Sequence, residues 1–363
     1  MKKEIRVLQL IDSLDAGGAE RMAVNIANGL LGRVKASHLC VSRKEGILKD
    51  TIHDEVGYCF LNKKCSIDIR SLRILRQYTR KNKINIIHAH SSSFFLAILL
   101  KLSLSNLKIV WHDHYGKSEH LESRSKTALI WCSLLFSQVF SVNEKLEQWA
   151  KDKLKCKHVL FLSNIATLNK EIEPQTRLKG SSNRILCLAN LRPQKDFENL
   201  LKAFRIVVES FPDWTLHCVG KDFEDDYASK IYRHVTAHNL SKHVFFYGSC
   251  SDISHIMSQC DIGVIASESE GLPLALLEYG LGELAVVTTD VGDCKLVVQD
   301  AINGILVKAK DEKQLADGLM RLIGNKELRL KLSRNLKHTI THSFSIDAIS
   351  KSLLSHYNLI FER

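Results

Sequence analysis

Short apolar runs alternate with longer amphipathic stretches along the whole chain. The short runs have the length and the Val, Ile and Leu content of buried strands, whereas stretches such as 197–208 repeat apolar residues at the spacing of a helix. This alternation is typical of a parallel α/β architecture. In the first half the predicted strands are Ile5–Ile11, Ala36–Val41, Gly57–Leu61, Ile84–His88, Lys108–Trp111, Val139–Val142 and His158–Leu162. In the second half they are Arg184–Ala189, Thr215–Val219, Val244–Tyr247, Ile262–Ala266, Ala285–Thr289 and Gly304–Val307.

A polar stretch separates the two sets of strands. Residues 169–183 contain proline, glycine and serine, which is the composition of a linker. We therefore predict a doubly wound, Rossmann-like domain over residues 1–168 and a second one over residues 184–343. Residues 344–363 are amphipathic and are predicted to form a C-terminal helix. The cleft between two such domains is the expected place for a ligand.

The positive charge of the chain is unevenly distributed. The formal net charge is +11, and residues 1–163 alone carry 27 Lys and Arg against 15 Asp and Glu. In the densest basic run, Arg73, Arg76 and Arg80 recur at helical spacing. Such a face attracts anionic lipid, nucleic acid or a phosphorylated acceptor, or it is simply a solvated helix face. The lack of helix-turn-helix, zinc-finger and RNP patterns argues against nucleic acid.

Length and cysteine usage narrow the class of protein. With 363 residues the chain fits two domains of ordinary size. Ten cysteines occur without a C-x-x-C pair or a secretory signal, so we expect reduced thiols and a cytoplasmic location. No uninterrupted apolar run reaches the ~18 residues that span a bilayer.

Two carboxylates flank a turn in the second half of the chain. Glu270 and Glu278 lie on either side of Gly271-Leu272-Pro273, directly after the apolar strand 262–266 and at the start of a helical run. In parallel sheets this strand-to-helix loop lies at the carboxyl edge, where ligands bind. A helix N-terminus attracts phosphate, and carboxylates accept hydrogen bonds from sugar hydroxyls. The alternative is a surface loop with solvated acidic groups.

The first half has polar candidates at equivalent strand ends. Gly17-Gly18 follows the first strand, where paired glycines let a ligand approach the backbone at a helix start. In His88-Ala89-His90 the strand alternation points both histidines to the same side. Two histidines do not make a metal site, and no third ligand is evident by spacing.

Two basic residues follow the first strand of the second domain. Arg192 and Lys195 lie three residues apart at a strand-to-helix turn, where a planar guanidinium and an ammonium suit a diphosphate. The alternative is a pair of exposed basic residues. The acidic stretch 222–226 is interpreted as a solvated loop rather than a metal site.

These stretches together resemble the retaining glycosyltransferases of family 4, which have the two-domain GT-B fold. The segment Glu270–Glu278 is similar to the Glu-x7-Glu motif of that family, and 289–293 is similar to its Asp-x-Gly-Gly stretch. The resemblance implies that Glu270, with Gly271, Leu272 and Pro273, lies near the transferred sugar. It also implies that Glu278 contacts the ribose of the nucleotide and that the C-terminal helix over residues 344–363 packs back on the first domain.

The resemblance extends to the other candidates. Gly17-Gly18-Ala-Glu-Arg looks like the family's N-terminal loop, and the stretch ending in His90 resembles its Val-Val-His-x-His, which implies a catalytic position for His90 beside the transferred sugar. His112 is similar to the His of the family's Thr-x-His loop, and His114 could serve instead. Lys195 matches a phosphate-binding lysine.

The chain departs from the family pattern near that lysine and after the second carboxylate. Asn190 stands where the phosphate-binding arginine is usual, so Arg192 is the candidate to replace it. Glu283-Leu284-Ala285 stands where a proline is usual, and Asp293 where a second glycine is common. These departures concern loops and leave the motifs recognisable.

The resemblance implies a retaining transfer of a sugar from a nucleotide-diphospho-sugar to an acceptor hydroxyl, with neither a cofactor nor a metal ion required. The basic first domain favours a lipid-linked or polysaccharide precursor as acceptor, at the inner face of the cytoplasmic membrane. A small free acceptor, a phosphorylase and a non-catalytic sugar-nucleotide-binding protein are the alternatives. Partners are then the nucleotide-sugar, a glycan or lipid-linked acceptor and an anionic membrane surface, and not nucleic acid.

Overall fold

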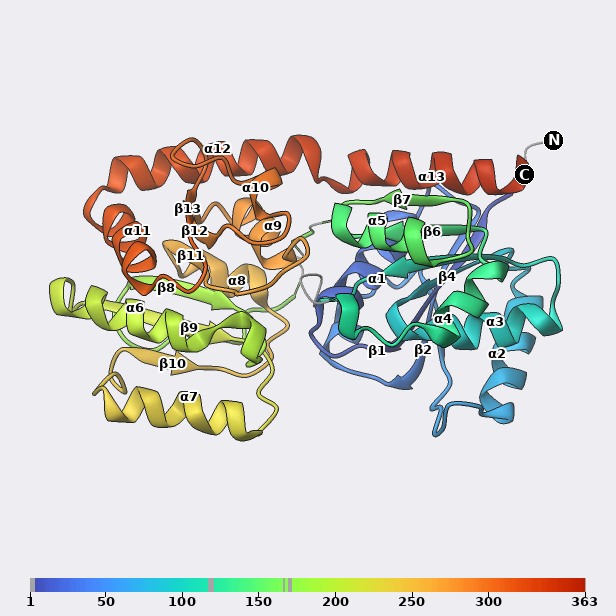
Figure 1. Cartoon of the computed structure of the whole chain (residues 1–363), viewed down its shortest axis with the longest axis horizontal. Helices are drawn as coiled ribbons and strands as arrows, with labels where there is room; N and C mark the ends of the chain where they lie inside the picture. The colour runs from blue at the N-terminus through green and yellow to red at the C-terminus, as the bar shows by residue number, and fades with distance from the viewer. Residues whose placement is uncertain (1–3, 117–120, 166, 169–171, 363) are drawn as a thin grey trace. The chain divides into compact units, whose positions relative to one another are not determined.

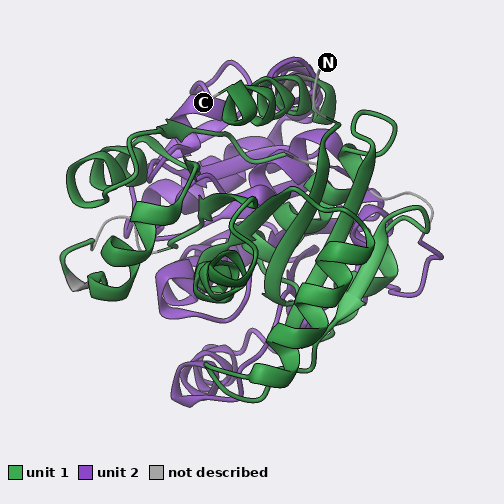
Figure 2. Cartoon of the chain, turned by 90° about the vertical axis from the view of Figure 1, so that its right-hand side faces the viewer, with its two compact units in different colours: residues 1–165, 345–363 green, residues 166–344 purple. Residues whose placement is uncertain are grey.

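The computed structural model describes residues 4–116, 121–165, 167–168 and 172–362, with only the backbone of residues 123 and 348. The chain divides into two compact units (Figure 2). Unit 1 comprises Met1–Ile165 and Ser345–Arg363, and unit 2 comprises Ala166–Phe344. Part of the predicted linker, residues 169–171, lies outside the described residues.

Unit 1 is built on a seven-stranded sheet in the order β3-β2-β1-β4-β5-β6-β7 (Figure 1). All its strand pairs are parallel. The strands are β1 (Arg6–Ser13), β2 (Ala36–Lys44), β3 (Gly57–Phe60), β4 (Ile86–His90), β5 (Lys108–Asp113), β6 (Gln138–Ser141) and β7 (Val159–Phe161). The α-helices are α1 (Gly18–Gly29), α2 (Ile69–Lys81), α3 (Phe94–Ser103), α4 (Thr127–Cys132), α5 (Glu144–Lys153) and α13 (Ile346–Glu362). Short 3-10 turns occur at Ile47–Thr51, Ser91–Ser93, Leu121–Ser123 and Ser133–Leu135.

The sheet of unit 1 buries apolar side chains on both faces, which explains its near-continuous hydrophobic strands. One face packs against α2, α3, α4 and α5. The other face packs against α1 and the C-terminal helix α13, whose Leu353, Tyr357 and Ile360 are buried against Val7 and Ile26. The last helix of the chain therefore completes the core of the unit that the chain begins.

Unit 2 is built on a six-stranded parallel sheet in the order β10-β9-β8-β11-β12-β13 (Figure 1). The strands are β8 (Asn183–Leu188), β9 (Trp214–Val219), β10 (Val244–Phe246), β11 (Ile262–Ile265), β12 (Ala285–Thr289) and β13 (Ile305–Val307). The helices are the 3-10 turn η5 (Pro193–Lys195), α6 (Phe197–Ser210), α7 (Asp226–Ala237), α8 (Ile253–Ser258), α9 (Leu274–Leu281), α10 (Cys294–Val297), α11 (Glu312–Gly324) and α12 (Lys326–Ser343).

Several helices begin at a side chain that caps their first turn. Asp68 accepts a hydrogen bond from the Ser71 N–H at the start of α2. Asp196, in the left-handed region with φ 48°, accepts one from the Asn199 N–H at the start of α6. These caps satisfy amide groups that have no partner inside the helix, so the sequence itself sets where the helices begin.

The structure confirms the predicted α/β class with two doubly wound, Rossmann-like parallel sheets. All thirteen predicted strands coincide with a strand of the described residues. The fourth strand continues to His90 rather than ending at His88, because His90 pairs in register with His112 of β5. The strand order reverses between β1 and β4 in one sheet and between β8 and β11 in the other. The carboxyl ends of these strands are the positions where doubly wound sheets bind ligands.

Candidate functional site

The predicted site residues cluster at these two reversal points, one in each unit. In unit 2, Lys195 follows β8 and Glu270 follows β11. In unit 1, Gly17 follows β1 and His90 ends β4. Each pair belongs to strands that are neighbours in the sheet. Residues about 75 positions apart in sequence are thereby brought to one edge.

Both predicted carboxylates are buried, Glu270 in the loop between β11 and α9 and Glu278 within α9. Glu270 is 8% exposed and Glu278 is 6% exposed, so neither is a solvated surface acid. Pro273 is the N-cap of α9, and Leu272 beside it is buried. Thr289 of β12 donates its hydroxyl to the Ser267 carbonyl at 2.8 Å and anchors the start of the loop.

Lys195 and Glu270 form an ion pair across the two neighbouring loops. Lys195 Nζ lies 2.5 Å from Glu270 Oε1, which also accepts a hydrogen bond from Ser267 Oγ at 2.6 Å. The Glu268 N–H donates to the Gln194 carbonyl at 2.9 Å and joins the same loops through their backbones. The structure thus places together the Lys195 ammonium, predicted to bind a diphosphate, and the Glu270 carboxylate, predicted to lie near a sugar.

Gly292 supports the Glu270 loop from the next strand. It has φ +52°, and a Cβ atom there would lie 2.3 Å from the Glu270 carbonyl oxygen and 2.4 Å from that of Gly271. The Asp293 N–H donates to the Gly271 carbonyl at 2.9 Å. Only glycine fits this close approach, which gives a physical reason for the Asp-x-Gly stretch.

In the loop after β8, the residues that depart from the family pattern make structural contacts. Asn190 Oδ1 accepts a hydrogen bond from the Lys221 N–H at 2.7 Å and so ties this loop to the one after β9. Arg192 is exposed, and its guanidinium carbon lies 4.1 Å from the ring centroid of Phe223. Lys221 Nζ lies 5.2 Å from the same ring. Sequence reasoning overlooked Lys221 and Phe223, whose only signal was their place after a strand.

The glycine pair of unit 1 has two distinct environments. Gly17 is the N-cap of α1, and a Cβ atom there would lie 2.1 Å from the Glu20 carboxylate, which folds back over it. Glu20 also accepts a hydrogen bond from Ser13 Oγ at 3.2 Å, and burial raises its pKa. At Gly18 a Cβ atom would meet nothing within 4 Å among the described residues. A Cβ atom at Gly17 would therefore displace the Glu20 carboxylate, whereas Gly18 leaves open space above the helix start.

Four histidines gather at the adjoining ends of β4 and β5. The rings of His88 and His90 are stacked with centroids 4.7 Å apart and planes 10° apart, which confirms that both point to one side. His112 lies 5.2 Å from His88 and 5.4 Å from His90. His114 lies 4.1 Å from His112, and its Nε2 is 3.0 Å from His90 Nδ1. We call these four residues the histidine cluster.

Burial keeps the histidine cluster uncharged. It lowers the pKa of His88 and His114 to about 3, and that of His90 and His112 well below the ordinary value. The neighbouring imidazoles add to the shift for His90 and His112. His88, His90 and His112 are fully buried, whereas His114 is partly exposed. His114 is thus the one member of the cluster with a solvent-exposed part.

Tertiary structure supplies the third histidine that sequence spacing did not reveal. One nitrogen each from His88, His90 and His112 lie within 4.8 Å of one another. A bound metal ion lies in the plane of every imidazole that ligates it, and the stacked planes of His88 and His90 do not meet at such a point. The residues as arranged do not fit a metal ion. That catalysis needs no metal stays a prediction.

A buried ion pair anchors the segment that carries His112 and His114. Arg124 donates to both carboxylate oxygens of Asp113, at 2.6 and 2.8 Å. Their side chains are 8% and 1% exposed, and the guanidinium carbon of Arg124 lies 4.3 Å from the centroid of Trp149. Sequence reasoning assigned no role to either residue of this pair.

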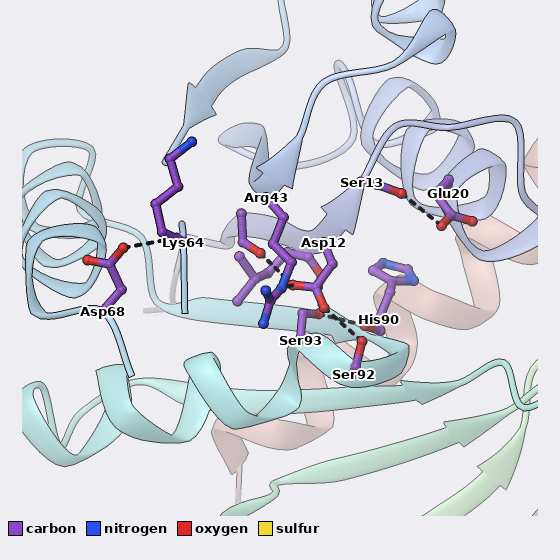
Figure 3. Close-up of polar contacts among 11 residues, drawn as sticks. Asp12, Ser13, Glu20, Arg43, Lys64, Asp68, His90, Ser92 and Ser93 are labelled. Carbon is purple, nitrogen blue, oxygen red and sulfur yellow. Dashed lines mark hydrogen bonds and ion pairs between the residues drawn. The ribbon is translucent and has the colours of Figure 1, made fainter. Parts of the chain in front are cut away.

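Asp12 is a further polar residue at the end of β1 that the sequence did not single out. Figure 3 shows its carboxylate among hydroxyl and guanidinium groups near His90. Ser92 Oγ donates to Asp12 Oδ2 at 2.7 Å, and Arg43 Nε lies 3.8 Å from Oδ1. Ser93 Oγ donates to the His90 carbonyl at 2.6 Å and fixes the turn into α3. A carboxylate follows the first predicted strand in the sequence, and this was the available signal.

Comparison with known proteins identifies both halves of the chain. Residues 169–339 match the family model described as glycosyl transferases group 1, and residues 16–161 match the model described as glycosyltransferase family 4. The two matches cover all the predicted site residues.

Similar full-length proteins and structures agree with these matches. The chain is 23% identical over 331 residues to the Escherichia coli UDP-Gal:alpha-D-GlcNAc-diphosphoundecaprenol alpha-1,3-galactosyltransferase, which covers 84% of each chain. It is 24% identical over 330 residues to an uncharacterized glycosyltransferase of Haemophilus influenzae, covering 88% of this chain and 90% of that one. Among solved structures, Anabaena Alr3699/HepE in complex with UDP and glucose superimposes with a TM-score of 0.80 at 17% identity, over 97% and 98% of the two chains. This last likeness establishes the GT-B fold.

Proposed function

Because the chain belongs to the group 1 glycosyltransferases of family 4, we propose that it transfers a sugar from a UDP-sugar to a lipid-linked acceptor with retention of configuration. Glycosyl transfer as such follows from the family. The donor, the acceptor and the stereochemistry are the proposal. UDP is supported by the names of the galactosyltransferase and of the complex described above.

The observation that carries the donor assignment is the group Lys195, Glu270 and Glu278 at the reversal point of unit 2. A diphosphate needs a cation that is held in place, and Lys195 is held beside the loop that ends in the N-terminus of α9. Carboxylates at this edge of the sheet can accept hydrogen bonds from the hydroxyls of a sugar and a ribose. We assign the diphosphate to Lys195, with Arg192 or Lys221 as the second cation, and the ribose to Glu278.

Retention needs no covalent intermediate in this proposal. The Glu270 carboxylate is already engaged by Lys195 and Ser267, so it is poorly placed to attack the anomeric carbon. We therefore propose that Glu270 stabilises the positive charge that develops on the sugar ring. The departing phosphate, held by Lys195, takes the proton of the acceptor hydroxyl on the same face.

A lipid-linked acceptor is supported by relatives and by charge. The E. coli relative and a Campylobacter jejuni N-acetylgalactosaminyltransferase, 34% identical over 92 residues, are named for diphospho-undecaprenol acceptors. A small acceptor is the alternative, since a Bacillus anthracis relative is named N-acetyl-alpha-D-glucosaminyl L-malate synthase.

Unit 1 also has a surface that suits an anionic membrane. On α2, Ile69, Arg73, Arg76 and Arg80 share one face by helical spacing, and Ile69 is 69% exposed. Arg73 and Arg80 are exposed, and these arginines form no ion pair with the described residues. Exposed apolar side chains beside basic ones are typical of peripheral attachment to anionic lipid. No described helix is long and apolar enough to span the bilayer.

Thermal-shift measurements with UDP, GDP, ADP and CMP and their sugar conjugates, with and without EDTA, test the donor assignment. A ligand that binds only the folded state raises the melting temperature. We expect the shift to occur with UDP and UDP-sugars, to be independent of EDTA and to vanish in Lys195→Met. Lys202→Met, which removes an exposed lysine of α6, is the matched control. A shift that survives in Lys195→Met contradicts the donor assignment.

Sedimentation with liposomes tests the membrane surface. Binding to vesicles with anionic lipid is expected at low salt and should weaken as salt screens the charges. The double variant Arg73→Gln/Arg80→Gln should lose most of this binding, while Arg233→Gln, an exposed arginine of unit 2, should keep it. Equal retention of all three proteins would exclude α2 as the attachment surface.

A further inference from the structure

The C-terminal helix reaches the histidine cluster through one side chain. Tyr357 lies on α13 and is fully buried, and its hydroxyl is 2.6 Å from His88 Nδ1. The two residues are 269 positions apart in sequence. Burial raises the pKa of Tyr357 above its ordinary value, so the phenol keeps its proton and is available to donate it to His88 Nδ1.

Gln9, a second buried residue, forms a hydrogen bond with the neighbouring ring of His90. His90 Nε2 lies 2.9 Å from the side-chain oxygen of Gln9, on β1. Since an amide oxygen only accepts, His90 carries its proton on Nε2 and has a lone pair on Nδ1. That lone pair accepts the proton of His114 Nε2, at 3.0 Å. His114 is left with a lone pair on Nδ1, and it is the partly exposed residue of the cluster.

We propose that Tyr357 and Gln9 are positioning residues that fix the tautomers and orientations of His88 and His90, so that His114 presents a lone pair to a hydroxyl of the bound sugar or acceptor. The inference rests on the proposed function for the identity of that hydroxyl. Its structural part, the tautomer of each ring, is independent of activity.

The stacking explains why both positioning residues are needed. His88 and His90 lie face to face at 4.7 Å, so a rotation of either ring would disturb the other. His88 Nε2 is buried without a hydrogen-bond partner among the described residues, so the Tyr357 bond is the one polar contact that holds this ring. In a buried imidazole, the hydrogen bond made by one ring nitrogen sets which nitrogen carries the proton.

The decisive variant is Tyr357→Phe, which keeps the buried ring and removes only the hydroxyl. The matched control is Tyr78→Phe, because the Tyr78 hydroxyl bonds His38 Nδ1 at 2.9 Å in the same unit but outside the cluster. Gln9→Met, similar in size, tests the His90 arm. Long-range proton–nitrogen NMR of protein labelled in its histidines reads the tautomers, with the His88 and His90 signals assigned through His88→Gln and His90→Gln.

We expect His88 and His90 of the parent protein to carry their protons on Nε2. Tyr357→Phe should change the His88 nitrogen signals and lower kcat by about 10- to 100-fold, as loss of an orienting partner does at other imidazole sites, with the donor KM within about twofold. Tyr78→Phe should alter neither the His88 nitrogen signals nor kcat. Unchanged histidine signals in Tyr357→Phe, an Nδ1 proton on His90, or an equal loss of kcat in Tyr78→Phe would each overturn the inference. If the parent protein transfers no sugar at all, the proposed function fails, and the nitrogen signals still decide whether Tyr357 and Gln9 set the tautomers.

Discussion

Replacing Glu270 by glutamine is expected to slow transfer and, at the same time, to tighten the binding of UDP. The Glu270 carboxylate holds the ammonium of Lys195 at 2.5 Å. A diphosphate must compete for that ammonium and also approach the carboxylate charge. The amide keeps the size and one acceptor oxygen of the side chain but removes the charge.

The size of the effect follows from the geometry. Two unit charges at this distance attract by roughly 7 kcal/mol at an effective dielectric constant of about 20, and the cost of burying them offsets most of that. The side chains of Lys195 and Glu270 are 23% and 10% exposed, which reduces the net value further. A remainder of about 1–2 kcal/mol corresponds to a Kd for UDP that is about 5- to 30-fold lower in Glu270→Gln. Loss of transition-state stabilisation should lower kcat by about 100-fold or more.

Calorimetric titration of UDP and single-turnover kinetics with UDP-sugar measure the two effects. Lys195→Met should weaken UDP binding by about 10- to 100-fold, which corresponds to the loss of one charge-assisted hydrogen bond. Glu268→Gln is the control, since Glu268 lies in the same loop and pairs with Lys310 at the surface, where an ion pair contributes little. Weaker UDP binding in Glu270→Gln would refute the reasoning, because Glu270 would then support the diphosphate site rather than compete for Lys195.

Three further predictions concern unit 1. Gly18→Ala should fold as the parent does and lose activity only if a ligand occupies the open space. Gly17→Ala should lower the melting temperature slightly, because its Cβ displaces the Glu20 carboxylate from its hydrogen bond with Ser13. Circular dichroism and transfer assays separate the two. The free energy of unfolding should fall as the pH drops from about 6.5 toward 3, because the histidines bind protons in the unfolded chain but stay uncharged in the folded cluster. His112→Gln should reduce this pH dependence by about 1.4 kcal/mol per pH unit in urea titrations. Arg124→Met should cost about 3–5 kcal/mol of stability by leaving a buried carboxylate without its partner, as measured by chemical denaturation.

Each of these has a clear contrary result. Equal melting temperatures for the two glycine variants would exclude the contact with Glu20. An unchanged slope in His112→Gln would mean that His112 is protonated in the folded protein. An Arg124→Met variant as stable as the parent would show that the pair with Asp113 is replaceable.

Much of the architecture could be predicted because it depends on the pattern of residues within short segments of the sequence. The period of apolar residues distinguishes strands from helices, and caps such as Asp68 and Asp196 mark helix starts within a few residues. The positions of Gly17, Lys195 and Glu270 after strands were likewise local facts. Parallel strands then place these loops at one edge of each sheet, which is why the candidate site could be located without coordinates.

Contacts between distant segments could not be predicted in this way. The ion pair of Lys195 with Glu270 depends on β8 and β11 being neighbours, although β9 and β10 lie between them in sequence. The third and fourth histidines join His88 and His90 only because β4 and β5 pair in one register, and a shift by one residue would turn them to opposite faces.

The sequence by itself therefore determined the fold class, the family and the loops that carry the chemistry, since periodicity, turn residues and motifs are properties of short segments. The tertiary structure alone decided which charges and rings meet. Asn190 ties two loops together, Arg192 stacks on Phe223, and Tyr357 returns from the end of the chain to hold His88. The physical reason is that side-chain partners in a parallel sheet are set by strand order and register, which arise from packing the whole core at once.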